Sequence, residues 1–192
     1  MEYLAILIGA MFINNIVLMQ FLGLCSFFGI STKMKPVVGM GLAVIVVMVL
    51  SVAITFPLYK FVLVGLQITY IDTIAFILVI ASLVQLTEVV IKRFSKGLYK
   101  ALGIYLPLIA TNCAVLGVAL QNVGDIANTN YLSALTYALG SGMGYAFIII
   151  VFAAIRLRLN SANVPRALKG MPIAFVTAGL MALAFMGLSG LI

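Results

Sequence analysis

The sequence predicts an all-helical membrane protein with six transmembrane helices, arranged as two inverted repeats of three. Of its 192 residues, 65% are hydrophobic and only 8% are charged, whereas soluble domains carry about 25% charged residues. The apolar residues also gather in runs of membrane-spanning length, and short motifs recur in the same order in both halves. We expect a single membrane domain over residues 1–192, with repeats at 1–96 and 97–192.

Six apolar runs have about the 20 residues that a helix needs to cross a bilayer core. They lie at 3–31, 37–59, 70–91, 101–121, 131–155 and 171–192. The first run is too long for the apolar core of a cleavable signal peptide, and it follows Glu2 rather than a basic segment. We therefore expect it to remain in the mature protein.

The basic residues predict the orientation of these spans. Only Lys60 falls in a loop on the side of the termini. Because cytoplasmic loops are enriched in Lys and Arg, both termini are predicted to lie on the outer face of the membrane. Short basic loops are what such an orientation requires, so the net charge of +7 does not indicate a nucleic-acid partner. The ten other basic residues share the opposite side: Lys33, Lys35, Lys92, Arg93, Lys96, Lys100, Arg156, Arg158, Arg166 and Lys169.

Three motif pairs indicate an internal duplication. The pairs are C-x-x-x-G at 25–29 and 113–117, G-M-G-x-A at 39–43 and 142–146, and I-A-F at 74–76 and 173–175. Each half holds three spans, an odd number, so the second half enters the membrane from the opposite side. Functional sites of inverted-repeat proteins tend to lie near the membrane midplane, often where helices are broken.

Glycine and proline predict breaks in the first and fourth spans. Gly23 and Gly29 flank Cys25, and Pro107 and Gly117 flank Cys113. Ordinary use of these residues is an alternative, because transmembrane helices tolerate both. Equivalent cysteines at the two positions favour genuine breaks.

The two cysteines, Cys25 and Cys113, are the candidate metal ligands. We expect both to be buried in apolar helices, and a lone buried cysteine is commonly only a small apolar residue. Thiolates, however, are the ligands that soft metals and iron–sulfur clusters select. Such a cluster usually has four cysteine ligands, and this chain has two. The residues alone leave open a partner chain, a homodimer, or no cluster at all.

Other polar residues at membrane depth are candidates for an ion path. Asn14, Asn15 and Asn112 have a simpler interpretation as makers of interhelical hydrogen bonds. Glu88 precedes Lys92 by one helical turn, a spacing that favours an ion pair over an ion-binding carboxylate. The G-M-G motifs are interpreted as sites of close helix packing.

Several enzyme classes are excluded by motifs that the sequence lacks. It contains no histidine, no Walker A motif, no G-x-G-x-x-G and no paired intramembrane carboxylates. An ATP-driven pump or a hydrolase is therefore not expected. A stand-alone secondary transporter or a structural scaffold remains as an alternative of another class, since inverted repeats suit a transporter.

At the cysteines the chain resembles a known family. The stretches NNIVLMQFLGLC, LGIYLPLIATNCAVLGVAL, FAAIR and TAGLMALAFMGLSGL resemble the A subunit of the Rnf complex, the ion-translocating ferredoxin:NAD⁺ oxidoreductase of prokaryotes. The resemblance runs from about residue 3 to the C-terminus. The E subunit of the Na⁺-translocating NADH:quinone oxidoreductase is the runner-up; it usually has a glutamate near position 14, where this chain has Asn14 and Asn15.

The resemblance implies a role in electron transfer. Cys25 and Cys113 would hold a [2Fe–2S] cluster together with two cysteines of the homologous E subunit, surrounded by Gly23, Leu24, Thr111 and Asn112. The cluster would relay electrons from a cytoplasmic iron–sulfur subunit to flavin-bearing subunits on the outer side, or in reverse. This implies the B, C, D, E and G subunits as partners in the cytoplasmic membrane, and coupling to Na⁺ or H⁺ transport. The resemblance assigns neither NAD nor flavin binding to this chain.

Overall fold

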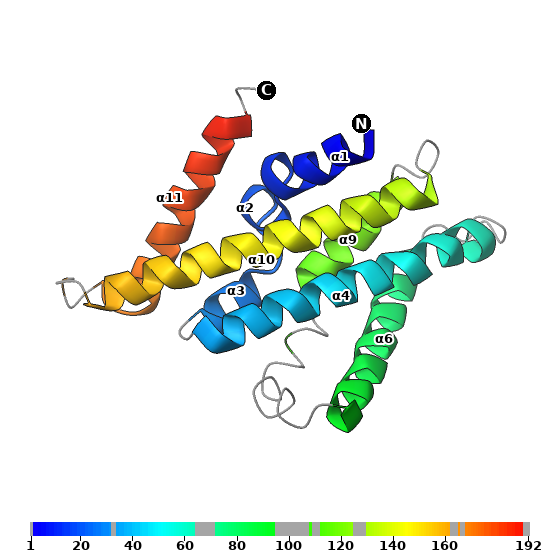
Figure 1. The fold of residues 1–192 in the computed structure, drawn as a ribbon, viewed down its shortest axis with the longest axis horizontal. Coiled ribbons are helices and arrows are strands. Elements are labelled where there is room, and N and C mark those ends of the chain that lie inside the picture. The colour runs from blue at the N-terminus through cyan, green and yellow to red at the C-terminus, as the bar shows by residue number, and fades with distance from the viewer. Residues whose placement is uncertain are drawn as a thin grey trace.

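The computed structural model describes residues 2–31, 34–63, 72–94, 108, 112–124, 130–161, 165 and 168–189. The regular secondary structure of these residues is entirely helical (Figure 1), which confirms the predicted all-helical class. In chain order the α-helices and the two π-helices, η1 and η2, are α1 (Glu2–Ile8), η1 (Gly9–Ile13), α2 (Ile16–Met19), α3 (Leu24–Ile30), α4 (Met34–Leu58), η2 (Tyr59–Leu63), α6 (Asp72–Phe94), α9 (Cys113–Gly124), α10 (Tyr131–Ser161) and α11 (Met171–Ser189).

The long helices α4 and α10 run side by side in opposite directions through the middle of the molecule (Figure 1). Small residues allow this close approach. A Cβ on Gly41 would lie 3.0 Å from the Ala146 Cβ, and a Cβ on Gly142 would lie 3.1 Å from the Ile45 Cα. Gly41 belongs to the first G-M-G-x-A motif, and Gly142 and Ala146 to the second. The interpretation of these motifs as sites of close packing is confirmed at these contacts.

Two of the described helices are long and apolar enough to cross a bilayer, Pro36–Phe61 and Tyr131–Ser161. They correspond to the second and fifth predicted spans. The described parts of the other predicted spans form shorter apolar helices: Tyr3–Ile13, Thr73–Leu86, Cys113–Asn122 and Met171–Gly187. The count of six spans therefore stays a prediction.

The first predicted span is broken, as expected. The π-helix η1 ends before Asn14, and Asn15 precedes the short helix α2. A second interruption separates α2 from α3, where Phe21 and Gly23 have positive φ values of 55° and 86°. This left-handed backbone cannot continue a right-handed helix. In the fourth predicted span α9 begins at Cys113, but Pro107 lies outside the described residues, so the break there stays a prediction.

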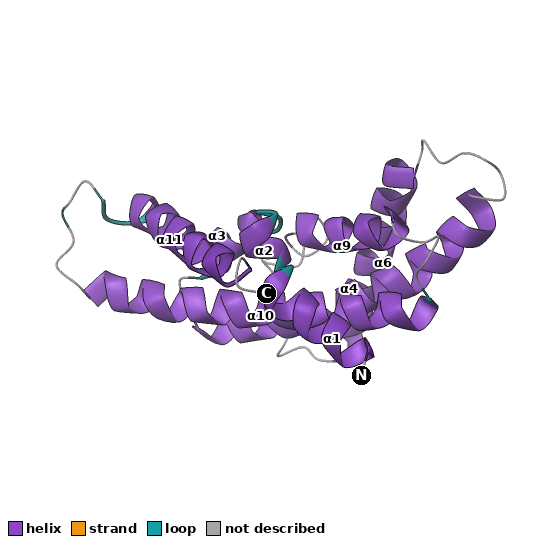
Figure 2. Ribbon diagram, turned by 90° about the horizontal axis from the view of Figure 1, so that it is seen from above, coloured by secondary structure: helices purple, strands orange, loops and turns teal. Residues whose placement is uncertain are grey.

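The shorter helices pack around the central pair. The broken first span (α1, η1 and α2) lies against α10, and α9 lies against α4. Two glycines of α10 admit the first span: a Cβ on Gly140 or Gly144 would lie 2.8 Å from the carbonyl oxygen of Leu7 or Met11, respectively. Figure 2 shows α2 and α9 on one side of α10, where they also contact each other. The interruption before α3 is thereby brought beside the start of α9.

Candidate metal centre

Cys25 is the second residue of α3 and follows the interruption directly. Gly23 precedes this helix in a left-handed conformation (φ 86°, ψ 14°), which glycine adopts without strain. Its position is also crowded, since a Cβ there would lie 3.1 Å from both the Ala114 Cβ and the Asn112 Oδ1. Gly23 therefore lets the turn before Cys25 lie directly against the turn before Cys113.

Cys113 is the first residue of α9, and Asn112 caps this helix. The side chain of the buried Asn112 accepts a hydrogen bond from the Ala114 N–H through Oδ1 at 3.1 Å. The backbone carbonyl oxygen of Asn112 accepts a second hydrogen bond from the Val115 N–H, also at 3.1 Å. Asparagine is among the preferred residues at this position. Cys113 consequently lies at the positive end of a 12-residue helix, a place that favours a negatively charged group.

The two thiols meet at this point. The Cys25 and Cys113 side chains lie close enough together to interact electrostatically. Both side chains are exposed on this chain. The expectation that they are buried is therefore wrong for the single chain. Each cysteine lies at a helix start rather than in the middle of a packed helix, so its side chain reaches the surface.

Asn112 leaves one polar atom unmatched beside the thiols. The residue is 2% exposed, and its Nδ2 has no hydrogen-bond partner among the described residues. Leaving a buried donor without an acceptor costs about 1–3 kcal/mol, and such a group in a native structure calls for an explanation such as a bound ion.

The donor set at this point suits an iron–sulfur cluster. Two adjacent thiols, the positive end of α9 and the unmatched Asn112 N–H donor all suit a soft, negatively charged metal centre. Among the described residues no group of three or more His, Cys, Asp or Glu side chains gathers to hold a metal ion. The described part of the chain therefore offers two of the four cysteines that such a cluster usually has.

A hydrogen-bonded pair behind the thiols was not predicted from the sequence. The Tyr145 hydroxyl of α10 lies 2.6 Å from the Ser26 Oγ, and Ser26 in turn donates to the Gly23 carbonyl oxygen at 2.9 Å. Tyr145 also lies beside Asn112, since a Cβ on Gly23 would be 3.2 Å from the Tyr145 Cε2 and 3.1 Å from the Asn112 Oδ1. Tyr145 lies inside the second G-M-G-x-A motif and Ser26 directly follows Cys25. In the sequence, only these positions next to a predicted motif or ligand pointed to Tyr145 and Ser26.

The comparison with known families decides the class of the chain. Residues 3–192 match the model of the family described as "Rnf-Nqr subunit, membrane protein". The chain belongs to the Rnf-Nqr family. Membrane residence, predicted from the composition, is thus a property of the family as well.

The Rnf-Nqr relatives include several proteins of nearly the same length. The A subunit of the ion-translocating oxidoreductase complex of Aeromonas hydrophila is 50% identical, and the protein of that name from Vibrio cholerae is 49% identical. The A subunit of the Na⁺-translocating ferredoxin:NAD⁺ oxidoreductase complex of Acetobacterium woodii is 51% identical. Each match covers 100% of this chain and 98% of the relative. The resemblance to the A subunit of the Rnf complex is confirmed.

The hydrogen bonds of Asn15 in the first span are not the interhelical ones that we expected. Asn15 is buried, donates to the Met11 carbonyl oxygen at 3.0 Å and accepts from the Val17 N–H at 3.1 Å. These hydrogen bonds are local, because the start of α2 has free N–H groups that need a partner. The interhelical interpretation is thus wrong for Asn15, while Asn14 is exposed. The structure does not test a role of either residue in an ion path.

Three further predicted residues have mixed outcomes. Leu24, beside Cys25, is half-buried and packs against the apolar core. Thr111 lies outside the described residues. Glu88 lies in α6, but its side chain is outside the described part of the chain, so its ion pair with Lys92 stays a prediction.

Arg156 was assigned to a cytoplasmic loop, but the structure places it in α10, where it is 9% exposed. Its guanidinium donates to the Phe28 carbonyl oxygen at 2.9 Å and to the Ser31 Oγ at 2.6 Å. The charge therefore meets the negative end of α3, the helix that begins beside Cys25. This contact fixes the far end of that helix to α10.

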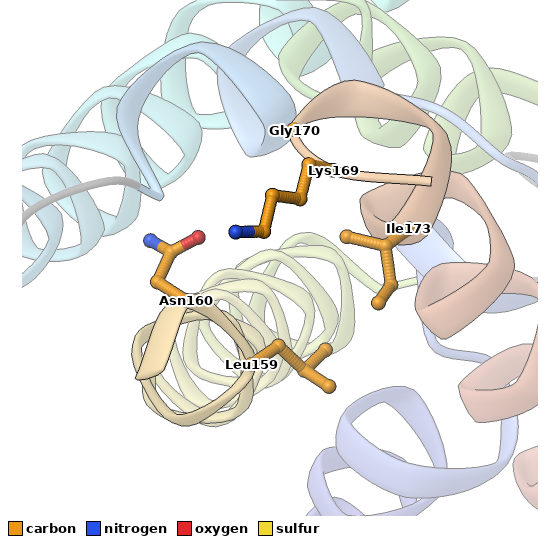
Figure 3. Close-up of a pocket in the computed structure, with 5 residues that line it drawn as sticks. All are labelled: Leu159, Asn160, Lys169, Gly170 and Ile173. Atoms are coloured by element: carbon orange, nitrogen blue, oxygen red, sulfur yellow. The ribbon is translucent and has the colours of Figure 1, made fainter. Parts of the chain in front are cut away.

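A cavity of about 190 Å³ lies at the junction of α10 and α11 (Figure 3). It is lined by Leu159, Asn160, Lys169, Gly170 and Ile173. Leu159 and Asn160 lie at the end of α10, Lys169 and Gly170 in the turn before α11, and Ile173 in α11. Tyr145, by contrast, lies in the middle of α10. The cavity is thus a separate feature from the cysteine pair.

Proposed function

We propose that this chain is the A subunit of an Rnf complex, an ion-translocating ferredoxin:NAD⁺ oxidoreductase, and that Cys25 and Cys113 hold half of an intramembrane [2Fe–2S] cluster. One observation carries the proposal: two cysteines from the two halves of the chain meet at one exposed point beside an unmatched buried donor. The names of the relatives support the class of the complex. In this proposal the chain contributes part of a shared redox site rather than a complete active site.

The site supports a cluster shared with a second chain. When bound, a [2Fe–2S] cluster accepts and donates single electrons. Cys25 and Cys113 supply two sulfur ligands, and the exposure of both thiols leaves room for two cysteines from another protein of the complex. The homologous E subunit is the proposed source of those cysteines, and the B, C, D and G subunits are the other proposed partners.

The inverted duplication is supported by the pattern of helix contacts. If the halves are exchanged, the broken first span corresponds to α9, α4 to α10, and α6 to α11. The contact of the first span with α10 then corresponds to that of α9 with α4, and the contact of α2 with α11 to that of α9 with α6. The pairs α4–α6 and α10–α11 correspond as well. Such symmetry is what two inverted three-helix repeats produce.

The orientation follows from the basic loops. Both termini lie on the outer face of the cytoplasmic membrane, and the side that carries ten Lys and Arg residues faces the cytoplasm. A cluster held by Cys25 and Cys113 would supply one-electron transfer between the ferredoxin side and the flavin-bearing subunits. This transfer is coupled to movement of Na⁺ or H⁺, and one relative is named for Na⁺. Asn14, Asn15 and Glu88 are the proposed contributors to the ion path.

Serine variants of the assembled complex test the cluster. We expect Cys113→Ser or Cys25→Ser to remove one [2Fe–2S] signal from the electron paramagnetic resonance spectrum of the reduced complex. We also expect about two fewer iron atoms per complex and loss of ferredoxin-dependent NAD⁺ reduction. The flavin content and the signals of the soluble clusters serve as internal controls and should persist. An unchanged iron content with normal activity would show that both cysteines only pack.

A stand-alone secondary transporter is the competing function, since broken helices and symmetric contacts also suit that class. Liposomes that contain only this chain separate the two functions. A transporter moves solute in them and tolerates Cys25→Ser and Cys113→Ser, whereas a redox subunit shows no flux by itself. Solute flux that persists in both variants would overturn the redox assignment.

A further inference from the structure

We infer that Tyr145 is a positioning residue that holds the two cysteine turns in register through its hydroxyl group. The inference rests on the proposed function, because the cysteine pair matters as a cluster site only if that function holds. It goes further by assigning a role to α10, which contributes no ligand. Tyr145 comes from the second half of the chain, and the turn that it holds before Cys25 comes from the first.

The direction of the hydrogen bonds can be deduced from the proton count. Ser26 has one hydroxyl proton and donates it to the Gly23 carbonyl oxygen at 2.9 Å. The Tyr145 hydroxyl, 2.6 Å from the Ser26 Oγ, must therefore be the donor in their shared hydrogen bond. The chain of bonds runs from Tyr145 through Ser26 to Gly23, the residue that precedes the helix of Cys25.

The same phenol reaches the other cysteine turn. It lies beside Asn112, the residue directly before Cys113, without a hydrogen bond to the Asn112 Nδ2. Its ring lies against the point where the two turns cross, since a Cβ on Gly23 would be 3.2 Å from the Tyr145 Cε2. Tyr145 is 0% exposed, so surrounding side chains hold the ring in place. One rigid group thus touches both turns.

Such a group acts on a metal centre without binding the metal. Residues that orient the ligands of a metal typically change metal affinity by about 10–100-fold when they are removed. Tyr145→Phe removes only the hydroxyl and retains the packed ring, so the helices should still assemble. The relative position of the two thiols then depends on packing alone. We expect a looser cysteine pair within an otherwise intact fold.

The first experiment follows the cluster in the purified complex. Compared with wild type, Tyr145→Phe should release this cluster's iron to a chelator about tenfold faster, broaden its paramagnetic signal and shift its midpoint potential. Tyr137→Phe is the matched control. It also removes a tyrosine hydroxyl from α10, and in the wild type that hydroxyl donates a hydrogen bond to the Gln121 Oε1 at 3.0 Å. Ser26→Ala should reproduce the effect of Tyr145→Phe, and the double variant should be no worse than either single variant.

The second experiment follows the thiols without a cluster. The full chain, purified in detergent and free of iron, is treated with dibromobimane, which becomes fluorescent when it bridges two neighbouring thiols. Wild type and Tyr137→Phe should react at the same rate, and Tyr145→Phe should bridge Cys25 to Cys113 several-fold more slowly. The serine variants Cys25→Ser and Cys113→Ser provide the background.

The two experiments separate the inference from the proposed function. If Tyr145→Phe slows bridging but the cysteine variants leave the clusters of the complex unchanged, Tyr145 orders the thiols and the cluster assignment fails. If the cluster depends on the cysteines but Tyr145→Phe matches Tyr137→Phe in both experiments, the positioning role is overturned. A loss of folding in Tyr145→Phe that Ser26→Ala does not share, with normal bridging in Ser26→Ala, would also overturn it.

Discussion

Gly23→Ala is the substitution that tests the crossing of the two cysteine turns. Two independent costs add at this position. A left-handed conformation, here φ 86°, costs an L-residue roughly 1–2 kcal/mol. The new Cβ would also lie 3.1–3.2 Å from Ala114, Asn112 and Tyr145, and overpacking of this kind costs about 1–3 kcal/mol.

Part of this cost is offset in the unfolded state, which alanine restricts by about 0.4–1 kcal/mol relative to glycine. We therefore expect Gly23→Ala to lower the free energy of unfolding by about 2–4 kcal/mol, which is a change of roughly 30-fold to 1,000-fold in the unfolding equilibrium. Titration of the purified chain with a denaturing detergent, followed by circular dichroism, measures this quantity.

Two other glycines separate the two costs. Gly170 also has a positive φ, 98°, but a Cβ there would meet no atom within 4 Å, so Gly170→Ala isolates the backbone cost. Gly187 also has no atom within 4 Å and lies in α11, where alanine should be neutral or stabilising by up to about 1 kcal/mol. If Gly23→Ala were no more destabilising than Gly170→Ala, the turns before Cys25 and Cys113 would not be in close contact, and the geometry of the site would be wrong.

Two further predictions concern the anchoring of α3 and the orientation of the chain. Arg156→Gln should destabilise the chain by about 1–3 kcal/mol, because the buried Phe28 carbonyl oxygen loses its charged donor. Arg158→Gln is the control, since Arg158 is exposed on the same helix. It should have no measurable effect in the same denaturation assay. A reporter that is active only in the cytoplasm should work when fused within residues 92–100 and be silent at the C-terminus, because the basic residues of that side are predicted to face the cytoplasm. The reverse pattern would overturn the orientation, and equal signals would contradict the number of spans.

The class of the protein and the pairing of the two cysteines could be predicted because each produces a recognisable pattern in the sequence. Apolar runs identify the helices, and the repeated C-x-x-x-G motif singled out Cys25 and Cys113, whose thiols the structure brings together. The packing role of Gly41 and Gly142 was also visible, since small residues at matching places permit close approach.

The support behind the cysteines could not be predicted, because it depends on tertiary contacts. Ser26 and Tyr145 are 119 residues apart, and neither residue type is unusual in a membrane helix. Arg156 was misassigned for a related reason. α10 continues to Ser161, beyond the predicted end of the span at residue 155, so a residue expected in a loop is buried against the end of α3.

Both cysteines lie at helix starts, where backbone N–H groups lack partners within the helix. In an intact helix the N–H groups around Cys113 would bond to carbonyl groups one turn earlier, and none could face a ligand. Because α9 begins at Cys113, these groups have no such partner, and Asn112 accepts hydrogen bonds from two of them, the N–H groups of Ala114 and Val115, while its own Nδ2 has no partner among the described residues. The two thiols are exposed on this chain, and hydrocarbon offers a polar group no hydrogen-bond partner, so a partner protein that covers them removes an unfavourable contact. Under the proposed function, the group that completes the cluster is also the group that removes this cost, so cluster formation and association with the partner protein stabilise each other.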